Sequence, residues 1–166
     1  MADFSERLLE FDAVKQMLRA YVGSAPGRAA VAGLAPRADL EEIERQHRLT
    51  AEVRVYWRGG GRFDFSGLAD CQDLLGRSRI TGSALDLSEL REVLNLADRA
   101  QSWRQIGLSP PETLTDGWPT VEELTRGLSD FAPLLGYFKN KILPDGTLDD
   151  RASPELARLR DRKSVV

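Results

Sequence analysis

The sequence predicts an all-α protein, a multi-helical domain with at most one short β-element. Apolar residues recur at three- and four-residue spacing along most of the chain, which is the period of one helix face. These runs are bounded by residues that start or end helices, with Ser or Asp before them and Gly or Pro after them. The 166 residues, 42% hydrophobic and 30% charged, are enough for one domain with a sizeable core.

The first three helices are expected before residue 59. Asp12 is expected to cap a helix over 13–22, whose apolar residues fall on one face. Ser24 is expected to cap a short alanine-rich helix over 26–31, and Asp39 a longer helix that reaches about Trp57. The buried stripe of the third helix is expected to consist of Leu40, Ile43, Leu49, Val53 and Tyr56.

A glycine triplet at 59–61 interrupts the helical pattern in the middle of the chain. The aromatic residues of 62–65 are expected to dock onto the core from an irregular loop, and a short helix is expected over 68–76. Asp86 or Ser88 is expected to cap the helix with the clearest periodicity. One face of that helix carries Leu87, Leu90, Val93, Leu94, Ala97, Ala100 and Trp103.

Two further helices are expected after a proline-containing break at 109–119. Thr120 is expected to cap the first of them, which should end near Gly127. The second is expected over 131–142. The sequence therefore predicts about seven helices in all.

The segment after residue 141 contains the clearest turn signal. Asp145-Gly146 is a tight-turn dipeptide, because Gly accepts a positive φ without steric cost and Asp tolerates it. Apolar residues on both sides of it predict a short β-ribbon or a sharp corner near 142–148. Ser153-Pro154 then predicts a helix start, since the Ser hydroxyl can cap a free N–H and Pro has no N–H to lose.

No catalytic constellation is recognisable in the sequence. A phosphate loop needs Gly-x-x-x-x-Gly-Lys-Ser/Thr after a strand, and no segment matches. The glycine triplet is expected to be a flexible connection instead. The single histidine, His47, lies in a charged run and is expected on the surface, while Cys71 is expected to be a buried, inert thiol. The chain alone is therefore expected neither to hydrolyse ATP nor to cut nucleic acid.

Two patterns leave ligand binding open, and for both the structural interpretation is favoured. The helix start at 23–28 carries an arginine and is able to attract an anion, but helix punctuation explains it as well. Asp145, Asp149 and Asp150 are carboxylates at short spacing, which Mg²⁺ or Ca²⁺ can use as ligands. The turn accounts for Asp145, and Asp150 is close enough to the next helix start to favour its dipole.

The charge balance argues against a nucleic-acid surface spread over the whole domain. The net charge is −3 and the sequence pI is about 5.3. A local basic and aromatic cluster is a candidate for nucleic-acid binding, although a solvated face is the favoured interpretation. This cluster consists of Arg77, Arg79, Arg104 and Trp103.

The composition predicts a cytoplasmic protein. Cys71 is the single cysteine, so an internal disulfide is excluded and a reducing compartment is expected. No apolar run approaches the roughly 18 residues of a membrane span. The first ten residues lack the basic and apolar regions of a signal peptide.

Two segments resemble the type-2 branch of the MutS family. The pattern Asp-Gly-x-Leu-x-Asp-x-Ala-Ser-Pro-Glu-Leu over 145–156 is similar to the segment that leads into the long lever helix of MutS proteins. Leu-Glu-Phe-Asp-Ala-Val over 9–14 is similar to the Leu-Glu-Phe-Asp-Lys-Ile that opens the type-2 branch, with Ala13 in place of Lys. The similarity runs from about Leu8 to Arg162 and is most specific at its two ends.

The resemblance implies a structural role for this chain. Residues 1–152 would form a helical core domain, and residues 153–166 would begin a lever helix that is cut short. No catalytic, cofactor-binding or metal-binding residue is implied within the chain. The residues that would fix the lever base and its exit angle are Asp145, Gly146, Asp150, Ser153 and Pro154.

For the complete parent, the resemblance implies a homodimeric ATPase with a C-terminal Smr nuclease domain. Such a protein would act on branched or mismatched DNA to suppress recombination, or on stalled ribosomes in ribosome quality control. ATP and Mg²⁺ would bind outside this chain, and the DNA-gripping clamp would lie beyond Val166. The alternative is a stand-alone helical interaction module, without catalysis, that binds a partner helix in an apolar groove.

Overall fold

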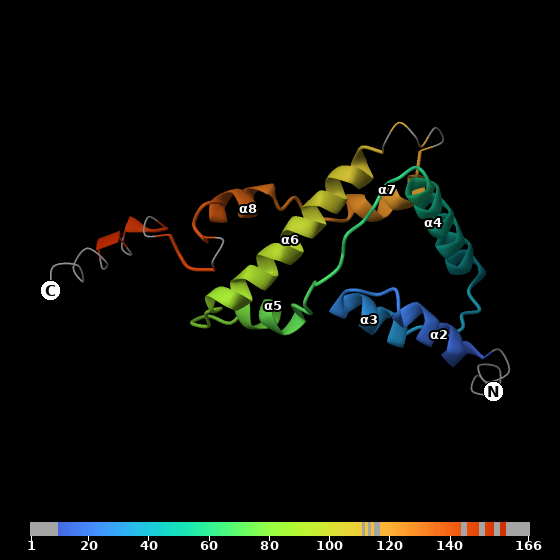
Figure 1. Cartoon of the computed structure of the whole chain (residues 1–166), viewed down its shortest axis with the longest axis horizontal. Helices are drawn as coiled ribbons and strands as arrows, with labels where there is room; N and C mark the ends of the chain where they lie inside the picture. Colours follow the sequence, from blue (N-terminus) through green and yellow to red (C-terminus); the bar gives the residue numbers. More distant parts are fainter. Residues whose placement is uncertain are drawn as a thin grey trace. The chain divides into compact units, whose positions relative to one another are not determined.

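The computed structural model describes residues 10–110, 112, 114, 117–143, 146–149, 152–154 and 157–158. Within these residues the chain forms seven helices and no strand (Figure 1). The β-pairing among these residues is limited to one isolated antiparallel bridge between Ile142 and Leu148. The predicted all-α fold is therefore confirmed. The helices are α2 (Phe11–Arg19), α3 (Ala25–Ala32), α4 (Leu40–Arg58), α5 (Gln72–Ser78), α6 (Leu87–Leu108), α7 (Pro119–Arg126) and α8 (Ala132–Phe138).

Three of the predicted N-caps are confirmed. The Ser24 hydroxyl accepts a backbone N–H bond of 3.1 Å at the start of α3, and an Asp39 carboxylate oxygen accepts one of 3.2 Å at the start of α4. At the start of α6, Asp86 accepts the backbone N–H of Glu89 at 2.9 Å, and Glu89 accepts that of Asp86 at 2.9 Å. This reciprocal capping box pairs two N–H groups that the helix itself leaves unpaired.

Two predicted caps are wrong. Helix α2 begins at Phe11, which places Asp12 inside the first turn, and the preceding Glu10 makes no capping bond. Helix α7 begins at Pro119, whose fixed φ suits the first helical position, so Thr120 lies inside the helix. The N-terminus of α7 is capped from another helix instead, as described below.

Helices α5 and α8 are shorter than predicted. Helix α5 starts at Gln72 rather than near 68, and Leu68 is buried in the segment before it. Helix α8 ends at Phe138 rather than near 142, because Lys139 leaves the helical region with ψ of 128° and Asn140 adopts φ of +64°. Asn tolerates this left-handed conformation better than most residues.

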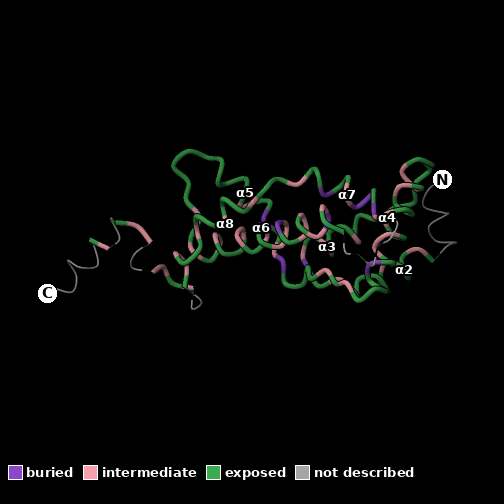
Figure 2. The backbone as a smooth tube through the Cα atoms, turned by 90° about the horizontal axis from the view of Figure 1, so that it is seen from above, coloured by how far each residue is buried: buried purple, intermediate pink, exposed green. Residues whose placement is uncertain are grey.

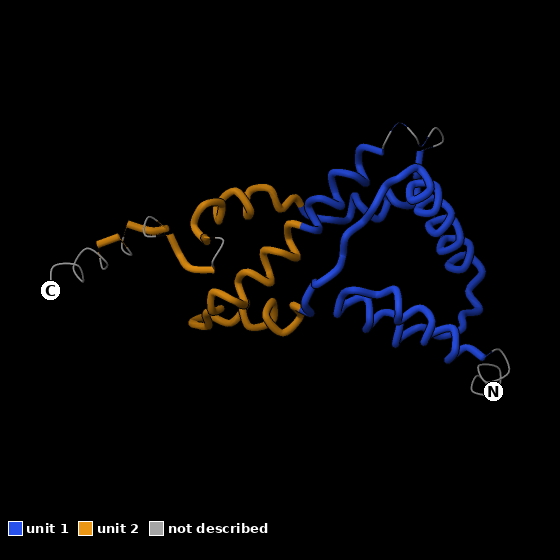
Figure 3. The backbone as a smooth tube through the Cα atoms, in the orientation of Figure 1, with its two compact units in different colours: residues 1–70, 99–129 blue, residues 71–98, 130–166 orange. Residues whose placement is uncertain are grey.

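The chain divides into two compact units (Figure 3). Unit 1 consists of residues 1–70 and 99–129, and unit 2 of residues 71–98 and 130–166. Helices α2, α3, α4 and α7 belong to unit 1, and α5 and α8 to unit 2; α6 begins in unit 2 and ends in unit 1. The predicted division of the chain at residue 152 stays a prediction.

Unit 1 contains a hydrophobic core where α4 packs against α7. The predicted stripe of α4 contributes in part: Tyr56 is buried and Leu49 and Val53 pack against the core, whereas Leu40 is exposed. Phe63, from the loop after α4, also packs there, as expected of the aromatics of 62–65. The buried members of the cluster are Tyr56, Leu114, Trp118 and Val121.

Outside this core, burial is sparse (Figure 2). Helices α2, α3, α5 and α8 contain no buried residue. Helix α2 ends at Arg19 rather than at residue 22 as predicted, and its predicted apolar face is uncovered: Met17 is 68% exposed, and Tyr21, which lies beyond the helix, is 86% exposed. Among the described residues, no helix combines the length and the apolar character that crossing a membrane requires.

Candidate functional site

A carboxylate in the middle of α4 caps the N-terminus of α7. One oxygen of Glu52 accepts the backbone N–H of Thr120 at 3.1 Å, and the other accepts that of Val121 at 2.9 Å. These N–H groups have no partner within their own helix, and a negative charge there is also favoured by the helix dipole. The bond pair fixes the packing of α4 against α7, and no local sequence signal around Thr120 predicts it.

Helices α6 and α7 approach closely at Gly107. A Cβ at this position would collide with the Thr125 hydroxyl and lie 2.8 Å from the Thr125 Cβ. Thr125 is fully buried, and its hydroxyl donates to the Val121 carbonyl at 2.6 Å. The carbonyl of Gly107 also accepts the indole N–H of Trp118 at 3.0 Å. The lack of a side chain at Gly107 is therefore what allows this packing.

The predicted turn near the end of the chain is present as a hydrogen-bonded corner in unit 2. Gly146 has φ of +83°, and its N–H donates to the Leu143 carbonyl at 2.9 Å. The N–H of Leu143 donates to the Thr147 carbonyl at 2.8 Å, next to the bridge at 142 and 148. The positive φ expected of Gly146 is confirmed. Such a conformation is costly for residues with a branched side chain.

Helical residues follow this corner. Pro154 is helical, and the N–H of Ala157 donates to the Ser153 carbonyl at 3.1 Å. Asp145 and Asp150, the two remaining members of the expected lever base, lie outside the described residues. The joint role of these residues in fixing a lever stays a prediction.

The glycine triplet at 59–61 does not fit a bound phosphate. Its three backbone N–H groups are already used in bonds of 3.0 to 3.1 Å to carbonyls of the last turn of α4. A phosphate loop needs such N–H groups to converge on the ligand. A Cβ at Gly61 would collide with the Tyr56 ring, so the triplet closes the helix against the core.

The start of α3 also lacks free N–H groups for an anion. Ala25 donates to the Leu68 carbonyl at 2.9 Å, Gly27 to the Ser24 hydroxyl at 3.1 Å and Arg28 to the Ser24 carbonyl at 3.0 Å. The intervening residue is a proline, which has no N–H. The residue types at the start of α3 are therefore explained by helix capping, without a bound anion.

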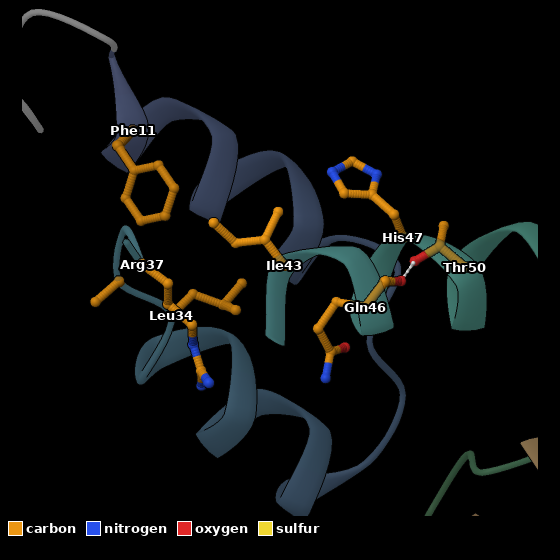
Figure 4. Close-up of a pocket in the computed structure, with 8 residues that line it drawn as sticks. Phe11, Leu34, Arg37, Ile43, Gln46, His47 and Thr50 are labelled. Carbon is orange, nitrogen blue, oxygen red and sulfur yellow. Dashed lines mark hydrogen bonds between the residues drawn. The ribbon is translucent and has the colours of Figure 1, made fainter. Parts of the chain in front are cut away.

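An open pocket of about 430 Å³ lies between α2, the segment after α3, and α4 (Figure 4). Phe11, Leu34 and Ile43 supply its apolar lining, and Arg37 and His47 lie at its polar side. His47 is exposed, as predicted. Of the residues of α2, Phe11 alone lines this pocket.

Cys71, the single cysteine of the sequence, is 3% exposed, so its predicted burial is confirmed. No group of three or more His, Cys, Asp or Glu side chains among the described residues has the geometry to hold a metal ion. Of the three carboxylates considered for a metal, Asp149 alone is described, and its N–H donates to the Lys141 carbonyl at 2.9 Å.

The residues of the predicted basic and aromatic cluster have structural partners. Arg77 forms an ion pair with Glu89 in unit 2, while the Arg104 Nε donates to the Leu128 carbonyl at 3.3 Å in unit 1. Trp103 packs on Phe63, with 4.2 Å between the ring centroids. Arg77 and Arg79 lie in unit 2, whereas Trp103 and Arg104 lie in unit 1. The four residues therefore do not belong to one compact unit.

A second, smaller pocket of about 180 Å³ lies in unit 1 beside Trp103, between α6 and the loop over 62–65. Phe65 and Arg99 line it, and the Arg99 guanidinium pairs with Asp64 at 3.2 Å. Hydrogen bonds from the Ser66 hydroxyl and N–H hold the pKa of Asp64 below its usual range, which keeps the carboxylate charged. The sequence indicates the docking of the aromatics but not this ion pair.

The comparisons with known proteins point to one group of relatives. No family model matches the chain. The chain is 32% identical over 160 residues to the protein named endonuclease MutS2 of Symbiobacterium thermophilum, which covers 96% of the chain and 19% of that protein. The chain is 29% identical to endonuclease MutS2 of Exiguobacterium sibiricum, in an alignment that covers 94% of the chain and 20% of that protein. It is 27% identical to endonuclease MutS2 of Aquifex aeolicus, with 95% of the chain and 19% of that protein covered.

The chain thus spans about one fifth of the length of the curated relatives it matches. The matched portion is nearly the entire chain, and it includes both compact units. On this similarity, the chain is a MutS2-related segment.

Proposed function

We propose that the chain is the non-catalytic helical core and lever-base segment of a MutS2-type protein. The observation that carries the proposal is the extent of the similarity: about 95% of the chain matches about one fifth of each relative named endonuclease MutS2. An all-α fold is consistent with a helical MutS-like domain. The proposed role is mechanical, since the described residues that were candidates for phosphate or metal binding have structural partners.

The mechanical role follows from the geometry of a rooted helix. A long helix that leaves a packed domain converts a small rotation at its base into a large displacement at its tip, provided that the base is rigid. The corner over 141–149 supports this role, because backbone hydrogen bonds cross it and Gly146 holds a conformation that few residues adopt. Among the described residues, the next helical one is Pro154.

For the complete parent we propose a homodimeric, ATP-dependent, DNA-binding endonuclease of the cytoplasm. Its substrate would be branched or mismatched DNA in the suppression of recombination, or a stalled ribosome and its rRNA. ATP and Mg²⁺ would bind outside this segment, because the glycine triplet at 59–61 has no N–H left for a phosphate. Support for the parent's activity comes from the name that the relatives carry.

A chimera tests the proposal. The chain would replace the matching segment of the Symbiobacterium thermophilum protein, and ATP hydrolysis and nuclease activity would be measured. We expect both activities to persist in the chimera and to be absent from the isolated chain. Gly146→Val in the chimera should leave nucleotide binding nearly intact and uncouple hydrolysis from nuclease activity, because the branched side chain strains the corner. Gly146→Asn is the matched control, since Asn tolerates positive φ.

A chimera that folds but lacks both activities would contradict the proposal. Metal-dependent ATP turnover by the isolated chain, abolished by changing one of its own residues, would contradict it as well. Equal coupling in the Gly146→Val and Gly146→Asn chimeras would show that the corner does not root a lever.

The uncovered face of α2 favours one alternative, a stand-alone interaction module that binds a partner helix. Val14, Met17 and Leu18 of α2 and Tyr21 just after it are exposed, and helix-in-groove binding uses apolar anchors of this kind. Met17→Glu distinguishes the two functions. If the face is covered inside a parent, this change should lower the melting temperature of the chimera; in a stand-alone module it should leave the chimera unchanged.

A further inference from the structure

Three aromatic rings meet in unit 1 where the loop over 62–65 lies against α6. The ring centroids of Phe63 and Phe65 are 4.2 and 5.8 Å from that of Trp103, and 6.1 Å from each other. Phe63 also packs on the buried ring of Tyr56, with 4.6 Å between the ring centroids. Phe65 is the outermost ring and is 43% exposed. The cluster therefore has a fixed inner ring and an accessible outer ring.

The small pocket of about 180 Å³ opens beside these rings. Its polar lining comes from Arg99 and Ser102 of α6 and from Arg62 and Asp64 of the loop. The Nε of Arg99 is buried and has no hydrogen-bond partner among the described residues, although the Nη2 of the same side chain pairs with Asp64. A guanidinium N–H can only donate, and a buried donor without an acceptor costs free energy. The exposed part of the Arg99 side chain, 36% of it, brings a guanidinium charge to the pocket wall.

An arginine stacked on a tryptophan extends this surface. The guanidinium carbon of Arg62, which also lines the pocket, lies 5.0 Å from the centre of the Trp57 ring. Its position is fixed by bonds to the carbonyls of Trp57 at 2.9 Å and Gly61 at 2.6 Å. Trp57 is 60% exposed. We name the combined region, Trp57, Arg62, Phe65, Arg99 and Trp103, the stacking surface.

We propose that the stacking surface binds an unpaired base of a single-stranded nucleic acid. Exposed aromatic rings interleaved with arginines are the features with which proteins stack bases and hold the backbone beside them. A base edge presents acceptors that suit the guanidinium N–H groups of Arg62 and Arg99, and donors and acceptors that suit the Ser102 hydroxyl. The pocket is smaller than the roughly 300–1,000 Å³ of sites for drug-sized ligands, so it suits a single flat ring.

The charge of the chain determines how this binding depends on salt. A net charge of −3 leaves only local arginines to contact phosphates, and the Asp64 carboxylate offsets one of them. Few counterions are released in that case, so the affinity falls only gently with salt. Stacking then supplies most of the preference for strands with unpaired bases over abasic or paired strands. The affinity for any oligonucleotide is weak. The proposal does not depend on the MutS2 relationship.

Fluorescence anisotropy with the full chain tests the proposal. The probes are labelled oligo(dT) and oligo(rU) of about 12 nucleotides, an abasic oligomer of the same length, and a duplex. We expect the two single strands to bind within a few-fold of each other, since thymine and uracil share the same ring and hydrogen-bonding edge, and at least fivefold more tightly than the abasic strand. The duplex, whose bases are paired, should bind no better than the abasic strand.

Substitutions locate the binding. Phe65→Ala should weaken oligo(dT) binding about 5- to 150-fold, the range that loss of one stacked base gives, while Phe65→Trp should retain it. Arg99→Lys keeps the charge beside Asp64 but loses the planar guanidinium with its several N–H donors, and should weaken binding severalfold. Tyr21→Ala removes an exposed ring elsewhere in unit 1 and should have no effect. Circular dichroism would establish that each variant keeps its helices.

Several results would overturn the proposal. Equal affinity for base-containing and abasic strands would reduce the interaction to phosphate contacts. Wild-type binding by folded Phe65→Ala would place the contact elsewhere. Absence of binding to every oligonucleotide at low salt, or capture of an aromatic peptide that oligo(dT) does not displace, would show that the surface serves a protein partner instead.

Discussion

Gly107 shows how one missing side chain sets the spacing of two helices. Gly107→Ala should destabilise unit 1 by about 1–3 kcal/mol, the usual cost of forcing extra volume into a packed core. Thr125 cannot move aside easily, because it is fully buried and its hydroxyl is bonded to Val121. The change in unfolding free energy, measured from urea midpoints, checks this prediction.

Gly136→Ala is the matched control, since Gly136 is also helical but a Cβ there meets nothing within 4 Å. Ala is the better helix former, so this variant should be neutral or more stable by about 0.5–1 kcal/mol. If both variants lose the same stability, the contact between Gly107 and Thr125 is not the constraint described above.

At the scale of helices, the stability of α7 should depend on Glu52 of α4. Glu52→Gln removes the charge and one of the two acceptors, which should lower the unfolding free energy by about 1–3 kcal/mol. Glu44→Gln is the control on the same helix: its pair with Arg48 at 3.7 Å is solvent-exposed, and such pairs contribute about 0–1 kcal/mol. Equal losses in the two variants would show that Glu52 contributes no more than a surface charge.

The N-terminus of α6 should respond to acid. Bonds from the Glu89 N–H and the Ser88 hydroxyl hold the pKa of Asp86 below its usual value of about 3.9. Because the folded-state pKa is lowered, the stabilisation is fully present above about pH 4 and is lost as pH falls through the lowered pKa. Asp86→Asn keeps a good N-cap but removes this titration.

We therefore expect wild type to be more stable than Asp86→Asn at neutral pH and the two to converge in acid. Thermal melts across the range from neutral pH to about pH 2 give the comparison, which covers the titration of a lowered Asp pKa. A constant difference between the two melting temperatures across that range would show that the Asp86 carboxylate does not titrate with folding.

The helix starts show what local sequence can predict. The caps at Ser24, Asp39 and Asp86 are made to an N–H three residues away, so the residue type at one position is informative. The cap of α7 comes from Glu52, 68 residues before Thr120, and no local pattern encodes it. Sequence reasoning placed the cap on Thr120 because a hydroxyl residue there matches the local signal.

Some features of the candidate sites are likewise predictable from local sequence, and others depend on tertiary contacts. The positive φ of Gly146 follows from the chemistry of an Asp-Gly turn. The docking of Phe63 onto the core follows from its place after a glycine break, whereas Phe65 of the same loop is 43% exposed. The pairing of Arg99 with Asp64 depends on which loop meets α6, and that is a tertiary contact. Periodicity along a single helix carries no information about its partner across the core.

For the whole molecule, two compact units predict two unfolding transitions. Trp57, Trp103 and Trp118 all lie in unit 1, so tryptophan fluorescence reports on that unit alone, whereas far-ultraviolet circular dichroism reports on the helices of both. Unit 1 contains the hydrophobic core cluster, and α5 and α8 of unit 2 bury no residue. We expect part of the dichroism signal to be lost at lower urea than the fluorescence signal. Coincident curves would show that the two units unfold together.

The bond between Glu52 and Val121 also has a consequence in time. These residues are 69 positions apart in the chain. At synthesis rates of 5–20 residues per second, about 3 to 14 seconds separate the appearance of α4 from that of the N–H groups it caps. During this interval the nascent α4 has neither α7 nor Trp118 to cover its Tyr56 side. We therefore expect the nascent chain to bind chaperones through this apolar side until α7 emerges, and slower translation to lengthen that binding.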